Sequence, residues 1–451
     1  MTRPAPLSGF PEWLPAGRLV EQQILDSLRQ TFELHGFAPV ETRAVEPLAD
    51  LLRKGETSKE VYVLSRLQDQ FGPDERADGK RLGLRFDLTV PFARYVLEHA
   101  GRLDFPFKRY QIQKVWRGER PQEGRFREFY QADIDVVGQG SLPFHYEVEL
   151  PLVMAEALAR LPIGRVQILA NNRKLSEGFY RGLGLEDIDA VLRAIDKLDK
   201  IGPAAVADLL AADSGAGPPE AAACLELAAV SGTEADQVTA AVTALAGRYG
   251  VANALLDEGL AELAALLEGT AAALPGAVAA DLKIARGLDY YTGTVYESVL
   301  FGQESLGSVC SGGRYDSLAS DGAHSYPGVG LSVGVSRLVS RLLGQFLVGV
   351  TRPTPTAVLV AVADEASRLD SEAVARALRA RGIPADVAPT AARFGKQIRH
   401  ADRRSIPYVW FPAADGAPDE VKDIRSGDQT AADPASWRPP EDDLWPRLTQ
   451  L

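Results

Sequence analysis

Residues 107–138 contain seven lysines or arginines between apolar stretches, and two aspartates follow near the end of the segment. Period-two alternation in the last part puts Gln131, Asp133 and Asp135 on one face of a strand. Arg117 and Arg125 flank a turn-like Glu-Arg-Pro-Gln-Glu-Gly stretch, so a returning strand can bring both guanidiniums over one polyphosphate. The segment therefore predicts an anion clamp facing an amine pocket, and the alternative is a solvated basic hairpin with surface salt bridges.

This segment resembles motif 2 of the class II aminoacyl-tRNA synthetases, in the form found in histidyl-tRNA synthetases. The stretch Ala-Arg-Gly-Leu-Asp-Tyr-Tyr-Thr-Gly at 285–293 resembles the histidine-specific signature of that family. Residues 328–337, Gly-Val-Gly-Leu-Ser-Val-Gly-Val-Ser-Arg, resemble motif 3. Three motifs in the family's order imply a ligase that activates histidine with ATP and transfers it to the 3′ end of tRNA(His).

The resemblance implies an α+β catalytic domain over residues 1–350, built on an antiparallel sheet of the class II synthetase type. Residues 186–278 are alanine-rich with helical spacing, which predicts a helical insertion domain. The proline-containing segment 351–355 is typical of a stiff linker. Beyond it, strand and helix patterns alternate over 356–451 and predict an α/β domain with a mainly parallel sheet. This last domain resembles the anticodon-binding domain of several class II synthetases.

The reaction needs fixed positive charge, because the histidine carboxylate attacks the α-phosphate of ATP and negative charge develops on the phosphate oxygens. The resemblance implies that Arg117 and Arg286 are catalytic, with Arg286 at the α-phosphate. An ion pair of Arg286 with Asp289 is the alternative. Binding of ATP, which carries its own Mg²⁺, is assigned by resemblance to four residues: Arg117, Glu119, Arg125 and Arg337. No metal site of the protein's own is expected.

Selection of histidine needs a pocket that satisfies the imidazole nitrogens and the ammonium group together. Asp87 and Thr89 are assigned to the substrate amine by resemblance, although Asp87 can instead cap the helix expected over 90–99. The tyrosines offer hydroxyls and flat faces, although tyrosines are also ordinary core residues. The full set of expected histidine-binding residues is Asp87, Thr89, Gln131, Asp135, Arg286, Tyr290, Tyr291 and Tyr315.

A formal net charge of −12 argues against indiscriminate coating of nucleic acid, but local charge points to a selective RNA partner. Residues 101–127 carry eight basic against three acidic side chains. Residues 393–404 carry five basic side chains against one aspartate on about one helix, for which a solvated helix face is the alternative. The residues expected to contact tRNA(His) are Arg120, Gln122, Arg393, Lys396, Arg399 and Arg403.

Residues 1–11 lack a basic region followed by an apolar core, and no stretch offers about 18 uninterrupted apolar residues, so we expect a cytoplasmic protein without a membrane partner. Two cysteines are too few for a disulfide framework. The family resemblance implies a homodimer.

Two other functions stay open at this level. One is a non-catalytic, synthetase-like regulatory subunit of histidine biosynthesis, although such relatives typically lack the C-terminal domain. The other is a class II synthetase for proline, threonine or glycine, against which the Tyr290-Tyr291 pair argues.

Overall fold

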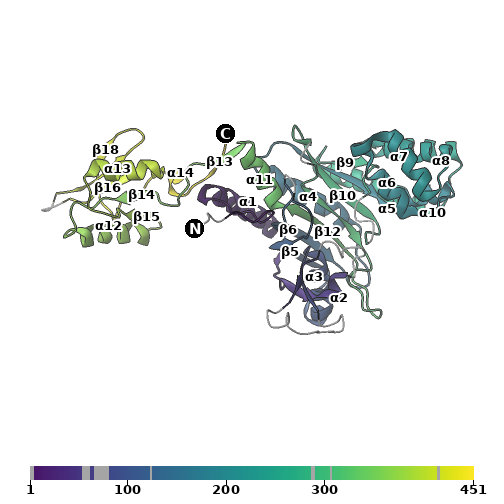
Figure 1. Ribbon diagram of the computed structural model, residues 1–451, viewed down its shortest axis with the longest axis horizontal. Helices are drawn as coiled ribbons and strands as arrows, with labels where there is room; N and C mark the ends of the chain where they lie inside the picture. Colours follow the sequence, from purple (N-terminus) through teal and green to yellow (C-terminus); the bar gives the residue numbers. More distant parts are fainter. Residues whose placement is uncertain are drawn as a thin grey trace. The chain divides into compact units, whose positions relative to one another are not determined.

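The computed structural model describes residues 5–52, 61–65, 81–121, 124–285, 290–304, 307–413 and 417–451. By their contacts the residues form two compact units. The larger unit comprises Met1–Pro11 and Ile24–Arg341, and the smaller one comprises Glu12–Gln23 and Leu342–Leu451. Figure 1 gives the labels of the helices and strands.

The larger unit is built on a sheet that has nine strands within the described residues. The strands from β5 to β7 in the sheet order all pair antiparallel, which confirms the predicted antiparallel sheet. The pairs β1–β5 and β7–β9 are parallel, and β8 pairs antiparallel with β9. In spatial order the strands are β1 (Ala38–Pro39), β5 (Phe107–Trp116), β6 (Glu128–Val137), β12 (Gly328–Gly334), β11 (Cys310–Tyr315), β10 (Thr294–Leu300), β7 (Val166–Asn172), β9 (Val278–Asp281) and β8 (Ser231–Gly232).

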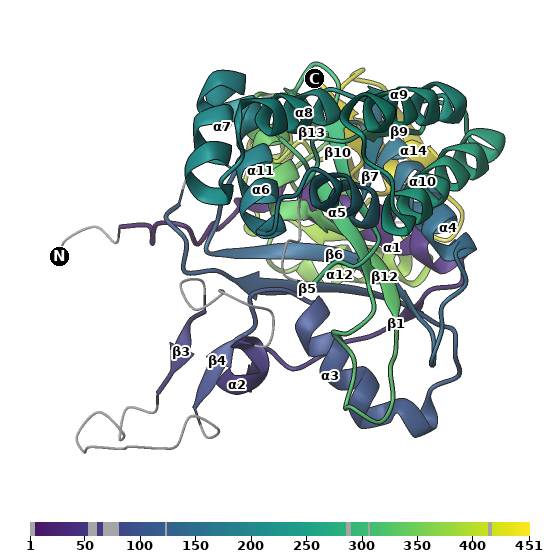
Figure 2. The ribbon, with the colours of Figure 1, turned by 90° about the vertical axis from the view of Figure 1, so that its right-hand side faces the viewer.

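Two helices cover opposite faces of this sheet. Arg314 and Tyr315 are neighbours on β11, so their side chains point to opposite faces. Arg314 reaches Glu147 of α4 (His145–Ala159), whereas Tyr315 packs with Phe92 and other apolar residues of α3 (Thr89–His99). Figure 2 shows α3 on one side of β5 and β6, with α4 and α10 on the other. The α3 side is the face that carries the candidate site.

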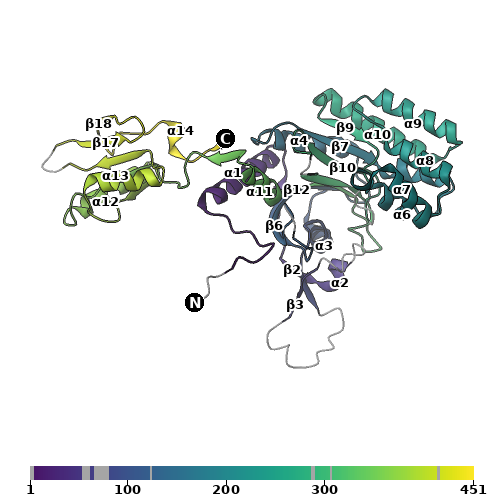
Figure 3. The same cartoon turned by 45° about the horizontal axis from the view of Figure 1, so that its top comes forward.

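Local sequence explains two further helices, which lie near the two ends of this unit along the chain. In α1 (Pro15–Leu34) the apolar spacing of four residues buries Leu28 and Phe32 completely, and Gly36 ends the helix at a φ of 76°. The helix α11 (Val335–Gly344) continues directly from β12. A small three-stranded sheet lies beside the main one (Figure 3). The elements there are β2 (Val45–Pro47), α2 (Leu48–Leu51), β3 (Val63–Leu64) and β4 (Leu82–Leu84), with the 3-10 turn η4 (Ala100–Arg102) after α3.

Residues 186–278 are mainly helical, as the alanine-rich pattern predicted, and form the cluster labelled α6 to α10 in Figure 3. Two of its elements are also tied to the main sheet, because β8 pairs with β9 and α10 packs on β7 and α5. Across the described chain, no helix has the length and apolar character needed to cross a membrane. The helices are α5 (Arg173–Gly182), which precedes the insertion, and α6 (Ile188–Ile195), α7 (Leu198–Ser214), α8 (Pro218–Ala228), α9 (Ala235–Tyr249) and α10 (Ala254–Ala273).

The smaller unit contains a five-stranded sheet in the order β15-β14-β16-β17-β18 among the residues described. The pairs of β14 with β15 and β16 are parallel, but the pairs β16–β17 and β17–β18 are antiparallel. The prediction of a mainly parallel sheet was therefore wrong, and the sheet is mixed. Seven residues separate Phe411 from Asp419, which is too short for a crossover of about a dozen residues or more.

This unit otherwise follows the predicted alternation of strand and helix. A second, two-stranded sheet pairs β13 with β19. The elements are β13 (Val348–Val350), β14 (Val358–Val360), α12 (Arg368–Ala380), β15 (Ala385–Val387), α13 (Phe394–Arg403), β16 (Tyr408–Phe411), β17 (Asp419–Asp423), β18 (Gln429–Ala432), α14 (Glu441–Leu444) and β19 (Leu448–Gln450).

Candidate active site

The predicted polar face of β6 is present and buried. Gln131, Asp133 and Asp135 are each less than 10% exposed, and they lie opposite Gln113, Gln111 and Arg109 of β5 in the hairpin register. On the other side, β12 offers only small side chains, Gly330 opposite Asp135 and Ser332 opposite Asp133. A long side chain on β12 would fill the space over β6, so this composition leaves room for a ligand.

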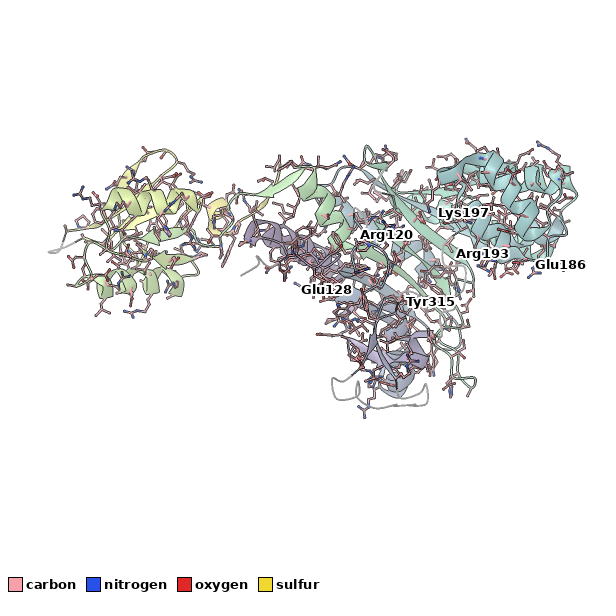
Figure 4. The ribbon with its side chains drawn as sticks, in the orientation of Figure 1. Arg120, Glu128, Glu186, Arg193, Lys197 and Tyr315 are labelled. Carbon is pink, nitrogen blue, oxygen red and sulfur yellow. The ribbon has the colours of Figure 1, made fainter. Side chains whose placement is uncertain are left out.

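Asp135 is held by two neighbours. The Tyr315 hydroxyl donates a hydrogen bond to Oδ1 over 2.7 Å, and Nη2 of Arg109 lies 2.7 Å from Oδ2. A Cβ atom on Gly330 would lie only 2.1 Å from Oδ1, so this strand position requires glycine. Tyr315, labelled in Figure 4, is itself packed against Gly328, where a Cβ would lie 2.5 Å from its ring. The carboxylate therefore has a fixed orientation.

A chain of hydrogen bonds links the other two residues of the β6 face. The Gln131 amide donates to Ser332 Oγ over 2.6 Å, and Ser332 Oγ donates to Asp133 Oδ1 over 2.5 Å. Burial raises the pKa of Asp133 to about 7, with Arg109 opposing the shift and Asp135 adding to it. Among the described residues, Gln131 Oε1 is buried without a hydrogen-bond partner, which leaves it as an acceptor for a ligand.

Asp87 has the capping role considered for it and also lies close to the polar face of β6. Its Oδ1 accepts a hydrogen bond from the Val90 amide over 3.2 Å and so caps the start of α3. The same buried carboxylate is near enough to Asp133 and Tyr290 to raise the pKa of both groups, although burial is the larger cause in each case. Thr89 is the first residue of α3 and is half-buried. The helix start thus brings Asp87 to the pocket.

The three tyrosines border the same pocket. The rings of Tyr290 and Tyr291 lie 4.1 Å apart between centroids, and Tyr291 packs over Gly313 of β11. Both belong to the apolar cluster under α3 that includes Phe92 and Tyr315. Burial raises the pKa of Tyr290 and of Tyr315, so both hydroxyls remain protonated and can donate hydrogen bonds at neutral pH. The three tyrosines are therefore core residues, and their role in binding histidine stays a prediction.

The arginines predicted to clamp an anion surround the end of the β5–β6 hairpin. The Arg117 Nε donates to the Phe86 carbonyl over 3.0 Å, and its guanidinium lies 5.2 Å from the Phe129 ring. The Arg337 Nη1 donates to the Ser308 carbonyl over 3.0 Å, and its side chain packs against Gly124 in the hairpin loop. Motif 3 is thereby brought beside motif 2.

The loop residues of the hairpin are more open. Arg125 is exposed and forms a 3.5 Å ion pair with Glu119, which is half-buried. Arg120 is also exposed, and Figure 4 labels it together with Glu128 at the start of β6. Arg286 and Gln122 lie outside the described residues. In the part of the chain that the structure describes, no group of three or more His, Cys, Asp or Glu residues is arranged to hold a metal ion.

Comparisons with known proteins match this geometry. The sequence model of histidyl-tRNA synthetase matches residues 9–338, and that of the anticodon binding domain matches residues 356–426. The chain is 59% identical to the histidine–tRNA ligase of Micrococcus luteus, over all of this chain and 99% of the relative. The chain belongs to the histidyl-tRNA synthetase family. It is also 59% identical to the histidine–tRNA ligase of Bifidobacterium animalis subsp. lactis, over 97% of each chain.

A solved histidyl-tRNA synthetase from Nostoc sp. PCC 7120 has the same fold, with a TM-score of 0.84 and 35% identity over 96% of this chain and 97% of that one. The histidyl-tRNA synthetase fold thus comprises the antiparallel catalytic sheet and the mixed sheet of the anticodon-binding unit.

In this histidyl-tRNA synthetase, the basic residues predicted on α13 are exposed. Gln397 and Ala401 face the core of the smaller unit, and Gln397 is bonded to both the amide and the carbonyl of Val362. The exposed side of the helix carries Lys396, Arg399 and Arg403, and Arg393 is exposed at the N-cap. None of the four lies within 4.0 Å of a carboxylate that the structure describes.

Sequence reasoning assigned no specific role to Arg109 or Ser332, although both lie beside the predicted pocket residues. Period-two alternation along 107–116 would have put Arg109 on the pocket face of its strand. The contact of Ser332 with Asp133 depends on the β6–β12 pairing, which joins residues 199 positions apart and leaves no local signal.

Proposed function

We propose that the buried face of β6, β12 and β11 binds histidine and that the adjacent arginines bind ATP. The chain is a histidine–tRNA ligase: it activates histidine with ATP to histidyl-adenylate and transfers the histidyl group to the 3′ end of tRNA(His). One observation carries the site assignment. A fixed, buried carboxylate, Asp135, lies on the same sheet face as Gln131 Oε1, at the base of the hairpin that carries Arg117.

In this proposal, hydrogen-bond acceptors in the pocket recognise histidine. Asp135 accepts a hydrogen bond from an imidazole N–H, and Gln131 Oε1 accepts one from the ammonium group, which Asp87 and Thr89 also contact. The rings of Tyr290 and Tyr291 form a wall of the pocket, and the Tyr315 hydroxyl orients Asp135. An amino acid without an N–H in its side chain cannot donate the hydrogen bond that Asp135 accepts from histidine in this proposal, so it binds less favourably and is rejected.

The same proposal places the phosphates of ATP against fixed cations. Arg117, Arg125 and Arg337 bind the nucleotide, Glu119 contacts the adenine side, and Arg286 meets the charge that develops at the α-phosphate. Mg²⁺ arrives with ATP as part of the substrate. The exposed position of Arg125 suits a side chain that closes over a bound nucleotide.

Contacts with tRNA are proposed at two places, Arg120 and Gln122 in the hairpin loop and the exposed residues Arg393, Lys396, Arg399 and Arg403 on α13. We place the enzyme in the cytoplasm with its tRNA. The alternative of a regulatory subunit is not retained, because both the catalytic and the anticodon-binding regions match ligases across their full length.

The function predicts charging of tRNA(His) by the purified protein. With ATP, Mg²⁺ and labelled histidine, a tRNA(His) transcript should accumulate label at its 3′ end, and a transcript for another amino acid should not. Periodate oxidation of the 3′ end is the control, since it removes the acceptor hydroxyl groups. If the folded protein neither charges tRNA(His) nor forms histidyl-adenylate, the proposal is contradicted.

We also propose a homodimer, because closed two-fold association is the commonest arrangement of soluble oligomers and is expected for class II synthetases. Light scattering at micromolar concentration should then give twice the 48.6 kDa mass of one chain. A mass equal to one chain at that concentration would show a monomer.

A further inference from the structure

Arg109 lies directly behind the pocket. It pairs with Asp135 across the β5–β6 hairpin, and both side chains are almost inaccessible, at 0% and 2% exposure. Its guanidinium carbon is 4.2 Å from the centroid of the Phe92 ring on α3. Among the described carboxylates, Asp135 is the one within ion-pair distance of Arg109.

A buried guanidinium is costly to keep at this position. Moving a charge out of water costs several kcal/mol, and an apolar side chain of similar volume would fill the space beside Phe92 without that cost. Nε and Nη1 of Arg109 have no hydrogen-bond partner within the described residues, so hydrogen bonds from these atoms do not offset the desolvation. The neighbouring carboxylates therefore have to account for the presence of a buried positive charge at position 109.

Two buried carboxylates lie close to the Arg109 cation. Asp133 and Asp135 stand on the same face of β6, and each raises the energy of the other when both are ionised. Ser332 donates to Asp133, whereas Tyr315 and Arg109 contact opposite oxygens of Asp135. Without the Arg109 charge, ionised Asp135 would lose this ion pair while remaining buried beside a second acid.

We propose that Arg109 is a specificity-determining positioning residue, which keeps Asp135 ionised and turned so that the pocket accepts the imidazole N–H of histidine. It acts through Asp135 and does not touch the reacting atoms. The inference rests on the proposed function of the pocket. It goes beyond the expected binding residues, because it makes imidazole recognition depend on a residue of β5 behind them.

The variants Arg109→Met and Arg109→Lys test this role in the full-length enzyme. Methionine keeps much of the volume and removes the charge, so the KM for histidine should rise roughly 10- to 100-fold while the KM for ATP changes little. Lysine restores a charge without the planar fork and should recover part of the loss. Arg352→Met is the matched control, because Arg352 is also buried but, among the described residues, its hydrogen bonds go to the backbone carbonyls of Thr354, Pro355 and Leu444 in the smaller unit.

Two competitive inhibitors separate positioning from loss of structure. Histidinol keeps the imidazole, whereas β-(2-thienyl)alanine keeps a five-membered ring without an N–H. The inhibition constant of histidinol should rise in Arg109→Met in parallel with the KM for histidine, and that of thienylalanine should stay within about threefold. Thermal unfolding of each variant reports whether it is folded at the assay temperature.

The outcomes are distinct. An unchanged histidine KM in a folded Arg109→Met variant would overturn the inference, as would equal losses for both inhibitors. If Arg109→Met does not fold, Arg109→Lys decides: a rise in the inhibition constant of histidinol without a matching rise for thienylalanine supports the inference, and unchanged constants or equal losses overturn it. Failure of the wild-type protein to activate histidine would instead reject the proposed function.

Discussion

Replacing Arg286 with alanine should slow the formation of histidyl-adenylate by on the order of 10²- to 10³-fold, because one preorganised donor to the developing phosphate charge is lost. Histidine affinity should change much less, since that charge builds up only as the carboxylate attacks. Tyr290 of the same sequence signature lies near enough to Arg117 and Asp135 for their charges to influence its pKa, although burial is the largest cause of its raised pKa.

Single-turnover quenching with ATP and saturating histidine measures the chemical step, and equilibrium binding measures histidine affinity. Arg286→Lys is the matched variant, because it keeps a charge but loses the planar fork, and it should retain an intermediate rate. A uniform loss of histidine affinity with an unchanged single-turnover rate would make Arg286 a ground-state contact.

Neutralising the exposed face of α13 should reduce tRNA charging without affecting adenylate formation. The variant changes Arg393, Lys396, Arg399 and Arg403 to glutamine. If each contacts one phosphate, the slope of log affinity against log salt should become shallower by about 3, since each contact adds roughly 0.7 to 0.9. At low salt, kcat/KM for tRNA(His) should fall on the order of 100-fold.

The control changes Arg438 and Arg447 to glutamine. Both are exposed arginines of the same unit, but each already pairs with a carboxylate, Glu441 and Asp442 respectively. Their loss should leave the salt slope unchanged. Equal slopes for the α13 variant and the wild-type protein would show that this helix face does not contact tRNA, and a loss of adenylate formation would show that it supports the catalytic fold.

Local patterns predicted the parts of the fold in which neighbours in sequence are neighbours in space. The alternation of Gln131, Asp133 and Asp135 defined the face of a hairpin strand, and the spacing of Leu28 and Phe32 defined α1. The antiparallel sheet was predicted from the resemblance to class II synthetases, because the sequence of a single strand does not reveal the order in which the strands pair.

The features that were missed depend on distant partners. The contact of Asp135 with Tyr315 joins residues 180 positions apart, and the role of Arg109 appears only when the hairpin register is known. The grouping of Glu12–Gln23 with Leu342–Leu451 has no local signal either. The mixed sheet arose because β17 and β18 follow short connections, which the alternation of helix and strand upstream could not indicate.

Amino-acid-dependent exchange of pyrophosphate into ATP tests the central claim most directly, because it reports adenylate formation at this pocket without any tRNA. The assay should be run with each of the twenty standard amino acids at the same ATP and Mg²⁺ concentrations. We expect exchange with histidine and none comparable with any other amino acid. Exchange with proline, threonine or glycine in place of histidine would contradict the account.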